Sequence, residues 1–424
     1  MKVLHVMPEF PNPPDAGGRA DMWNRLRVMC GLGYGIDVLV MDQKRVPEER
    51  HVADMRHLVN TLQFVPRRPL RRCIATIVPT TSARNGTLAD LCLDKQYDIT
   101  LAEGENACSI FDNPTLRTKA RVLRVHNNES RYMWLNAETE EGFFMRQFCR
   151  LEALRFVLFS RSVYRRVDSL WFISKSELQK FVASHSASAA KAVWLPPSII
   201  LGDEPERCAA HCKRVLFVAS LNNSLNREGL RWYLNEVHTS LTQDSDYELV
   251  VAGSTSGRAS AHHFVKEVQE QRRCSVHIDV DDLTALYNGC AVFINPMQRG
   301  TGLKMKNIHA LGRRVPVVTT SVGNEGSGFL DKEHVRVADT PAAFASAIRE
   351  LLNDEFSRVQ MAARAHEFLT KYYNSEANLQ RLLKNLLPES ACSGDERCPP
   401  GSTKSGMEPH NRGVTRTLWQ ENNL

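Results

Sequence analysis

Residues 291–320 read AVFINPMQRGTGLKMKNIHALGRRVPVVTT. A short apolar run, Ala291–Asn295, is followed by a glycine-rich loop, a helical stretch near Lys304–Leu311 and a second apolar run, Val315–Thr319. Short runs rich in Val and Ile on either side of a helix predict a strand–helix–strand unit of a parallel sheet. The stretch therefore predicts an α/β fold.

The loop in this unit has the composition of an anion site. Gly300 and Gly302 flank Thr301 just before the helix, so free backbone N–H groups lie there with a helix dipole behind them. Lys304 and Lys306 add positive charge one turn in. The spacing differs from GxxxxGK[ST], which disfavours a phosphoryl-transferring NTPase. We predict a phosphate cradle, and a solvated basic helix start remains the alternative.

The same alternation of apolar runs and helical stretches recurs along the whole chain. In the first half the runs are Val3–Met7, Ile36–Met41, Thr61–Val65, Asp98–Ala102, Arg121–Val125 and Ser169–Ser174, and in the second half Val215–Ala219, Glu248–Ala252 and Val276–Ile278 precede Ala291–Asn295. We expect two doubly wound domains, residues 1–200 and 201–355, each a parallel sheet with helices on both faces. A helical segment over 356–388 and a disordered tail over 389–424 are expected to follow.

Composition restricts the class of protein. The chain has 424 residues, of which 42% are hydrophobic and 24% charged, and these values exclude disorder for most of its length. No run approaches the ~18 apolar residues that span a bilayer, and the apolar start is too short for a secretory signal, so a cytoplasmic chain is expected. The eleven cysteines have no metal-ligand spacing, and no metal site is predicted.

Positive charge is concentrated in the first half. Residues 1–200 contain 28 basic and 21 acidic side chains, whereas the remainder contains 26 and 27. The positive electrostatic field of the first half suggests an anionic partner, although a solvated charged surface explains the excess of basic side chains equally well. Nucleic acid fits poorly, because no recognition motif accompanies the charge.

A segment from Phe143 to Arg166 mixes arginines with aromatic residues. This composition predicts either a helix lying in an anionic membrane interface, on the inner face of the plasma membrane, or a long core helix with a basic outer side. The arginines are Arg146, Arg150, Arg155, Arg161, Arg165 and Arg166.

Polar residues after other strands are further candidates, because ligands of parallel sheets bind at the carboxyl ends of strands. Gly17, Gly18 and Arg19 follow the opening strand, and the glycines permit positive φ and close approach of a ligand. His126, with Asn127, Asn128 and Glu129 behind it, ends another strand and has the chemistry to hydrogen-bond a substrate or exchange a proton. A helix cap at Asn128 or Ser130 is the structural alternative.

In order and spacing, residues 213–355 resemble the donor domain of retaining glycosyltransferases with the two-Rossmann (GT-B) fold, family 4 type. The match runs through Val215–Ser220, Asn226–Trp232, Leu249–Gly253, Asp281–Leu286, Ala291–Pro296, Gly300–Lys306 and Pro316–Thr320 with Asn324–Gly326. The first half is similar more loosely, through Gly17-Gly18 and Arg124–Glu129. The resemblance implies two domains facing across a cleft and a last helix that crosses back onto the first domain.

The resemblance also implies residue roles. His126 and Lys306 would be catalytic, and Gly17, Gly18, Arg19, Asn127 and Glu129 would lie on the acceptor side. A nucleotide-sugar pyrophosphate would be bound without metal or cofactor, its leaving diphosphate neutralised by basic side chains and helix dipoles. The implied donor-binding set is Ser220, Asn226, Arg227, Gly300, Thr301, Gly302, Lys304, Lys306, His309 and Glu325.

The sequence departs from this pattern at three places. The family usually has a second basic residue after the first strand of the donor domain, and Arg227 is the candidate for it here. His309 stands where the family commonly has a glutamate for the nucleotide ribose, and an imidazole lacks a carboxylate's two acceptor oxygens. The earlier glutamate of the motif is also missing, with Gln298 and Arg299 nearby. The leading prediction is a glycosyltransferase for a lipid-linked or oligosaccharide acceptor in cell-surface polysaccharide or glycolipid assembly. The alternatives are a nucleotide-sugar epimerase and a non-catalytic nucleotide-sugar-binding protein.

Overall fold

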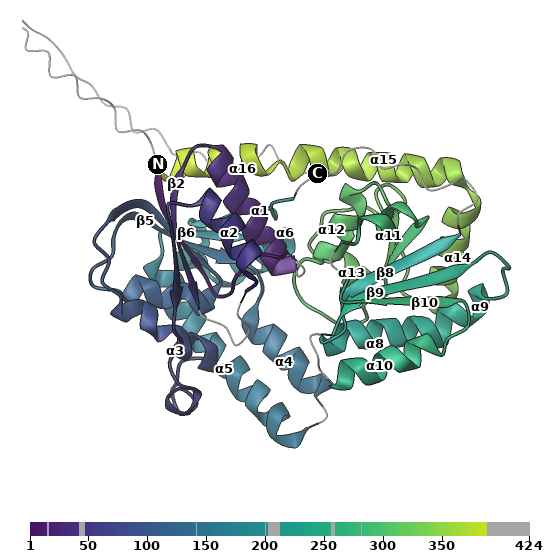
Figure 1. The fold of residues 1–424 in the computed structure, drawn as a ribbon, viewed down its shortest axis with the longest axis horizontal. Coiled ribbons are helices and arrows are strands. Elements are labelled where there is room, and N and C mark those ends of the chain that lie inside the picture. The colour runs from purple at the N-terminus through teal and green to yellow at the C-terminus, as the bar shows by residue number, and fades with distance from the viewer. Residues whose placement is uncertain are drawn as a thin grey trace, which may run out of the picture. The chain divides into compact units, whose positions relative to one another are not determined.

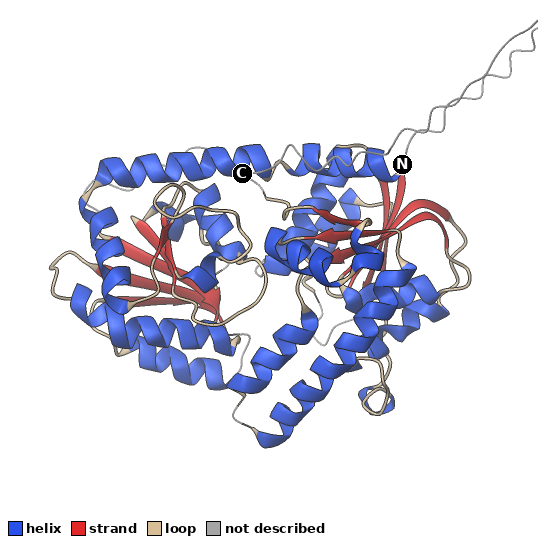
Figure 2. Cartoon of the chain, turned by 180° about the vertical axis from the view of Figure 1, so that it is seen from behind, coloured by secondary structure: helices blue, strands red, loops and turns tan. Residues whose placement is uncertain are grey.

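The computed structural model describes residues 1–14, 17–41, 47–140, 142–199, 201, 213–255, 259–280 and 282–387. It contains two parallel sheets, each covered by helices, as Figure 1 shows from one side and Figure 2 from behind. The predicted α/β fold with two doubly wound sheets is therefore confirmed. We call each sheet with its covering helices a lobe. The predicted tail, 389–424, lies outside the described residues.

The first lobe is built on a seven-stranded sheet of order β3-β2-β1-β4-β5-β6-β7. Its strands and helices are β1 (Lys2–Met7), α1 (Gly17–Gly31), β2 (Gly35–Met41), α2 (Glu49–Leu58), β3 (Thr61–Val65), η1 (Leu70–Arg72), α3 (Thr80–Arg84), η2 (Asn85–Asp90), β4 (Gln96–Glu103), η3 (Glu105–Asp112), β5 (Arg117–Val125), α4 (Glu129–Thr139), α5 (Phe143–Arg166), β6 (Ser169–Phe172), α6 (Lys175–Ser184), α7 (Ser186–Ala189) and β7 (Ala192–Trp194).

The second lobe is built on a six-stranded sheet of order β10-β9-β8-β11-β12-β13. Its elements are β8 (Arg214–Ser220), α8 (Ser224–Trp232), η4 (Tyr233–His238), α9 (Thr239–Leu241), β9 (Glu248–Ser254), α10 (Ala259–Gln269), β10 (Cys274–Ile278), α11 (Thr284–Asn288), β11 (Val292–Asn295), α12 (Met305–Gly312), β12 (Val317–Thr319), α13 (Ser321–Asn324), β13 (Arg336–Val337), α14 (Pro341–Asn353) and α15 (Glu355–Tyr372). The last described helix, α16 (Ser375–Leu386), packs onto the first lobe.

The central strands are apolar on both faces. Every residue of β11 is buried, and so are all residues of β2 except Gly35. Strands sandwiched between two helical layers read as continuous rather than alternating apolar runs, because neither face meets water. Order and direction then place the carboxyl ends of β1, β4 and β5 side by side in one lobe, and those of β8, β11 and β12 in the other.

The last two helices belong to different cores. Ala365 and Leu369 of α15, with Tyr373 just after it, pack into the second lobe, whereas Leu379 and Leu383 of α16 pack into the first. The Tyr373 hydroxyl donates a hydrogen bond to the Ser327 carbonyl (2.7 Å). Figure 1 shows α15 and α16 following one another along the same side of both sheets. The chain thus ties the two lobes together a second time after β7.

Helix α5 corrects part of the prediction made for the arginine-rich segment. Arg155 is buried, where it donates hydrogen bonds to Glu152 Oε1 (2.6 Å), Thr80 Oγ1 and the Ile74 carbonyl. Arg166 pairs with Asp112. The membrane-facing role is therefore wrong for Arg155, because a guanidinium fully engaged inside the lobe cannot meet a lipid headgroup. None of the described helices is long and apolar enough to cross a membrane.

Candidate active site

The glycine-rich loop between β11 and α12 lies against the first lobe. Gly302 has φ +68°, and a Cβ at this position would come within 2.4 Å of Asn127 Oδ1. The Thr301 hydroxyl donates a hydrogen bond to the same Asn127 oxygen (3.1 Å). Only glycine combines this backbone conformation with so close an approach. The loop predicted as a phosphate cradle thus meets the segment that carries His126.

Lys304 lies just before α12 rather than one turn inside it. Its ammonium donates hydrogen bonds to the carbonyls of Gly302 (2.6 Å) and Thr301 (3.2 Å), and the side chain is buried. Burial lowers the pKa of Lys304 to about 8, against the opposing influence of the Glu325 and Glu177 carboxylates. This lysine therefore fixes the shape of the glycine loop from within.

Lys306 lies in the first turn of α12. It donates a hydrogen bond to Asn226 Oδ1 (2.8 Å) and lies 5.3 Å from the centre of the Phe217 ring. Burial, and then the charge of Lys304, lower the pKa of Lys306 to about 7. Because the helix N-terminus has free N–H groups beside this ammonium, the position suits a phosphate, which would restore the full lysine charge.

Three more residues of the predicted donor set gather at the end of β8. Asn226 donates a hydrogen bond to the Ser220 carbonyl (2.9 Å), and Arg227 donates one to the Leu221 carbonyl (2.7 Å). Asn226 therefore links the end of β8 to Lys306. The structure brings Ser220, Asn226, Arg227 and Lys306 together on one side of α12.

His309 shares the Lys306 face of α12. The two residues are partly exposed, whereas Asn307, Ile308 and Ala310 between and beside them are buried. Burial, and then the positive charge of Arg313, lower the pKa of His309 to about 4. At neutral pH this imidazole is uncharged and offers one hydrogen-bond donor and one acceptor.

Two carboxylates flank the meeting point of the lobes. Glu325 forms an ion pair with Lys180 of α6 (2.7 Å). Burial would raise the pKa of Glu325, but the hydrogen bond from Lys180 and the charge of Lys304 outweigh it, and the pKa is lowered. Glu129, the first residue of α4, has its pKa raised to about 8 by burial and then by the nearby Glu105 and Glu177 charges.

Asn128 caps α4 by accepting a hydrogen bond from the Arg131 N–H, so the capping alternative is confirmed for Asn128.

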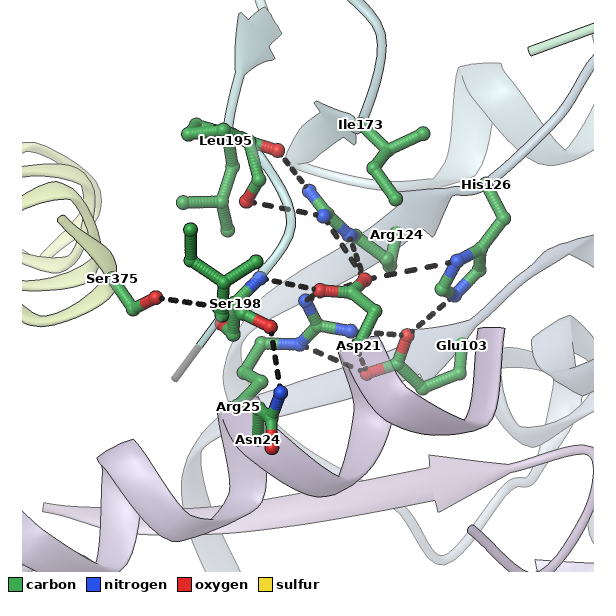
Figure 3. A network of polar contacts seen from close by, with 12 residues as sticks. Asp21, Asn24, Arg25, Glu103, Arg124, His126, Ile173, Leu195, Ser198 and Ser375 are labelled. Atoms are coloured by element: carbon green, nitrogen blue, oxygen red, sulfur yellow. Dashed lines mark hydrogen bonds and ion pairs between the residues drawn. The ribbon is translucent and has the colours of Figure 1, made fainter. Parts of the chain in front are cut away.

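His126 is held by a buried network of charges (Figure 3). Its Nε2–H donates to Glu103 Oε2 (2.7 Å), and its Nδ1 lies 3.8 Å from Asp21 Oδ2. Glu103 lies at the end of β4, next to the strand that precedes His126, and Asp21 lies on α1. The His126 side chain is 21% exposed, whereas both carboxylates are fully buried. The ring is therefore fixed by groups that water does not reach.

Two arginines neutralise the carboxylates of this network. Arg25 donates to both Glu103 oxygens (2.7 and 2.8 Å) and to both Asp21 oxygens (3.0 and 2.9 Å). Arg124 donates to Asp21 Oδ2 (3.0 Å) and to the Leu195 carbonyl. Burial would raise the pKa of Glu103, but Arg25 and the hydrogen bonds from two histidines, of which His5 is the second, hold it well below its usual value. Both carboxylates are ionised at neutral pH.

The same network contains metal-ligand side-chain types. Among the described residues, Asp21, Glu103 and His126 are the one group of three whose ligand atoms lie within 4.8 Å of one another. Both carboxylates already bind guanidinium groups, so a cation would have to displace Arg25 or Arg124 from a paired, buried position. The donor set fits paired arginines better than an ion.

The two acceptor-side glycines lie at the start of α1. Gly17 is the first residue of α1, and neither Gly17 nor Gly18 has a positive φ. Gly17 does permit a close approach, since a Cβ there would lie 2.8 Å from Met305 Cγ at the start of α12. Arg19 donates a hydrogen bond to Glu9 Oε2 (3.2 Å). The two helices thus begin next to each other.

The network that holds His126 was not predicted from the sequence. Asp21 and Arg25 have the spacing of an ordinary surface ion pair on a helix, and Glu103 ends an apolar run like many others. His5, within the opening strand, also donates to Glu103 (2.6 Å). A polar residue inside a continuous apolar run, as at His5, is the one local signal that a buried partner exists.

Part of the chain is similar to known glycosyl transferases. Residues 212–354 match the family described as glycosyl transferases group 1. A Klebsiella pneumoniae protein, described as an uncharacterized 44.6 kDa protein in the cps region, is 28% identical over 394 residues, which is 90% of this chain and 99% of that protein.

Solved structures share the arrangement of both lobes. TarM of S. aureus, in a complex with fondaparinux, α-GlcNAc-glycerol and UDP, has a TM-score of 0.68 at 10% identity and covers 92% of this chain and 100% of its own. Sucrose-phosphate synthase from Thermosynechococcus elongatus has a TM-score of 0.65 at 13% identity, and the match covers 92% of this chain and 100% of the synthase chain. WaaG, a glycosyltransferase involved in lipopolysaccharide biosynthesis, has a TM-score of 0.60 at 14% identity, and the match covers 91% of this chain and 100% of the WaaG chain. Residues 212–354 therefore match the glycosyl transferases group 1 family, within a chain that has the GT-B fold.

Proposed function

We propose that this protein transfers a sugar from a nucleotide-sugar donor to a lipid-linked or glycan acceptor, with retention of the anomeric configuration and without a metal ion. The observation that carries the proposal is the contact of the Gly302 loop with Asn127. It brings the start of α12, with Lys306, close to the strand end that carries His126. An anion site and a fixed imidazole on facing lobes suit a substrate with a diphosphate at one end and a sugar at the other.

In the proposed reaction the donor diphosphate binds at the N-terminus of α12. Lys306 and the free backbone N–H groups stabilise the charge that develops on the leaving diphosphate, which is the role that a metal ion has in other transferases. His126, fixed through Glu103, binds the donor sugar on the opposite lobe. The acceptor hydroxyl attacks the anomeric carbon on the face from which the diphosphate departs. The carbon–oxygen bond to the acceptor forms as the carbon–oxygen bond to the diphosphate breaks, the hydroxyl proton passes to the departing diphosphate oxygen, and the original configuration is kept.

The setting that we propose is cell-surface polysaccharide or glycolipid assembly. Its support comes from the relative in the cps region and from WaaG, whose description places it in lipopolysaccharide biosynthesis. TarM, a similar fold, was solved with UDP. A donor screen with UDP-, GDP- and dTDP-sugars, read by mass spectrometry of transferred and hydrolysed products, tests the activity. Donor binding without any transfer or hydrolysis would favour the non-catalytic alternative.

His126→Ala separates a role in sugar transfer from a role in donor binding. The transfer rate is expected to fall about 30-fold, because the variant loses the fixed imidazole that would contact and position the reacting sugar, while UDP affinity changes by less than about threefold. Steady-state kinetics and calorimetric titration with UDP measure the two quantities. His262→Ala, which removes an exposed imidazole on α10, is the matched control and should behave as wild type. Equal rates for wild type and His126→Ala would contradict the assignment.

We further propose that α5 carries the acceptor-side membrane contact. Its outer face exposes Phe144 (89%), Leu154 (60%) and Leu158 (61%), together with Phe143 and Leu151. Exposed apolar side chains in one continuous stripe are unusual on a helix that faces water. Arg150, Arg161 and Arg165 are also exposed, and none of them pairs with an acidic side chain in the described part of the chain. Apolar residues flanked by free arginines suit the surface of an anionic bilayer.

Replacing Phe144, Leu154 and Leu158 together with serine tests this contact. Binding to vesicles of phosphatidylcholine and phosphatidylglycerol is expected to fall at least tenfold, because burial of these side chains in the interface drives binding. Sedimentation with vesicles at low and high salt measures the effect. Leu330→Ser with Phe356→Ser, two exposed apolar residues of the second lobe, is the control. Equal sedimentation of the triple variant and wild type would contradict the contact.

A further inference from the structure

A pocket lies at the edge of the second lobe, where β13 is the last strand of the six-stranded sheet. Its volume is about 320 Å³, which is within the range of ~300–1,000 Å³ that small-molecule sites occupy. The polar residues that line it come from β13 and the loop before it and from helices α14 and α15. They are Lys332, Arg336, Glu350, Ser357, Gln360 and Arg364. None of these residues belongs to the glycine loop, to α12 or to the network around His126.

Basic side chains outnumber acidic ones in the lining of this pocket. Lys332, Arg336 and Arg364 are opposed by a single carboxylate, that of Glu350, which pairs with Arg336. In the described part of the chain, Lys332 and Arg364 form no ion pair with an acidic side chain. Arg364 is held instead by neutral acceptors, the Glu333 carbonyl (3.0 Å from Nε) and Gln360 Oε1 (3.4 Å from Nη1). The pocket therefore has an excess of positive charge, which attracts an anion.

Arg336 has a hydrogen-bond donor that no group of the described chain satisfies. Its side chain is 16% exposed, and one end of the guanidinium pairs with Glu350. The Nε–H is buried and has no acceptor among the described residues. A buried donor without a partner costs free energy, so an acceptor oxygen brought by a ligand would be stabilising here. A phosphate suits this position, because its oxygens match the fixed fork of N–H donors on an arginine.

The remaining polar groups of the lining suit hydroxyls. The Glu350 side chain is 49% exposed and has a second carboxylate oxygen besides the one that pairs with Arg336. The Ser357 hydroxyl donates to Asp354 Oδ2 (2.7 Å), so its own oxygen remains able to accept a hydrogen bond. Gln360 offers an amide with both donors and an acceptor. A bare inorganic anion would leave these three groups unused.

We propose that this pocket binds a small phosphate monoester that also carries hydroxyl groups, which is the chemistry of a hexose phosphate. The phosphate accepts hydrogen bonds from Arg336, Arg364 and Lys332, and the hydroxyls donate to Glu350 and Ser357. A pocket of this volume suits one sugar ring with its phosphate rather than a glycan chain. Because the lining shares no residue with the candidate active site, this inference does not depend on the proposed function.

Calorimetric titration of the full chain with glucose 6-phosphate tests the proposal, with inorganic phosphate and glucose as the two partial ligands. Wild type is expected to bind glucose 6-phosphate with a dissociation constant of about 1 mM or lower, and each partial ligand at least tenfold more weakly. Lys332→Gln with Arg364→Gln removes two exposed charges of the pocket and should weaken glucose 6-phosphate at least tenfold. Arg381→Gln with Lys384→Gln, which removes two exposed charges of α16, is the matched control and should bind as wild type does.

A further variant distinguishes this pocket from the proposed diphosphate site. Lys306→Ala removes the charge at the start of α12 and should leave the affinity for glucose 6-phosphate unchanged. Loss of binding in Lys306→Ala would show that the probe binds at α12 and would overturn the inference. Equal affinities of wild type and the Lys332→Gln, Arg364→Gln variant would overturn it too, as would inorganic phosphate binding as tightly as glucose 6-phosphate. None of these results would contradict the glycosyltransferase proposal.

Discussion

Replacing Glu103 with alanine is expected to lower the free energy of unfolding by about 3–5 kcal/mol. The carboxylate accepts hydrogen bonds from Arg25, His5 and His126, and its side chain is fully buried. Without it, the Arg25 guanidinium keeps only Asp21 as a buried anion, which must then balance both Arg25 and Arg124. An uncompensated charge in a site that water cannot reach costs far more than a lost surface contact.

Urea denaturation at pH 7 measures this loss. The pH matters because the folded pKa of Glu103 lies well below the unfolded value, so the carboxylate's contribution is fully present above the unfolded pKa and is lost as pH falls through the folded pKa. Glu49→Ala is the control, since Glu49 is exposed and pairs with Arg56 on the surface of α2. The free energy of unfolding of Glu49→Ala should stay within about 0.5 kcal/mol of the wild-type value. A Glu103→Ala loss as small as that of the control would show that the network is not a unit of stability.

Lys306→Ala is expected to weaken UDP binding about 100-fold or more. The ammonium lies at the N-terminus of α12, where it and the helix N–H groups form the proposed diphosphate site. Removing one preorganised group that stabilises developing negative charge lowers a reaction rate about 10²–10³-fold, and we expect a comparable loss of affinity for the bound diphosphate. Calorimetric titration with UDP measures the change, and Lys266→Ala, an exposed lysine on α10, is the matched control.

The pH dependence of UDP affinity provides a second measure of the same residue. Because burial lowers the pKa of Lys306 to about 7 in the free protein, the lysine loses its positive charge as pH rises through neutrality. Affinity should therefore be highest below pH 7 and fall as pH rises through 7, by up to about tenfold per pH unit. Lys306→Ala should lose this dependence between pH 7 and 8. If Lys306→Ala bound UDP within threefold of wild type, the diphosphate would bind elsewhere.

Local sequence was sufficient to predict the second lobe and its loop. Continuous apolar runs such as Ala291–Asn295 can be buried on both faces only in a parallel sheet covered on both sides, and glycines followed by lysines at a helix start predict an anion site. These signals are contained within about thirty residues. The structure keeps Gly302 and Lys306 in the predicted positions but turns Lys304 back onto the loop carbonyls, a side-chain direction that spacing does not determine.

The burial of charged side chains followed no local pattern. Arg155 and Arg161 occur in the same arginine-rich helix, yet Arg155 is buried against Glu152 and Thr80 while Arg161 is exposed. Thr80 is far from Arg155 in sequence and reaches it only because the first lobe folds around α5. Burial therefore contradicts the membrane-facing role for Arg155, and membrane contact of the exposed arginines of α5 stays a prediction.

The sequence by itself determined the two-sheet fold, the glycine loop with its lysines, and His126 as the polar end of a strand, because each depends on residues close together in the chain. Only the tertiary structure decided what fixes His126, since Asp21, Glu103 and Arg124 come from separate elements whose ends meet when β1, β4 and β5 align and α1 crosses them. The physical reason is that buried charges require partners, and the fold supplies these partners across more than a hundred residues of sequence.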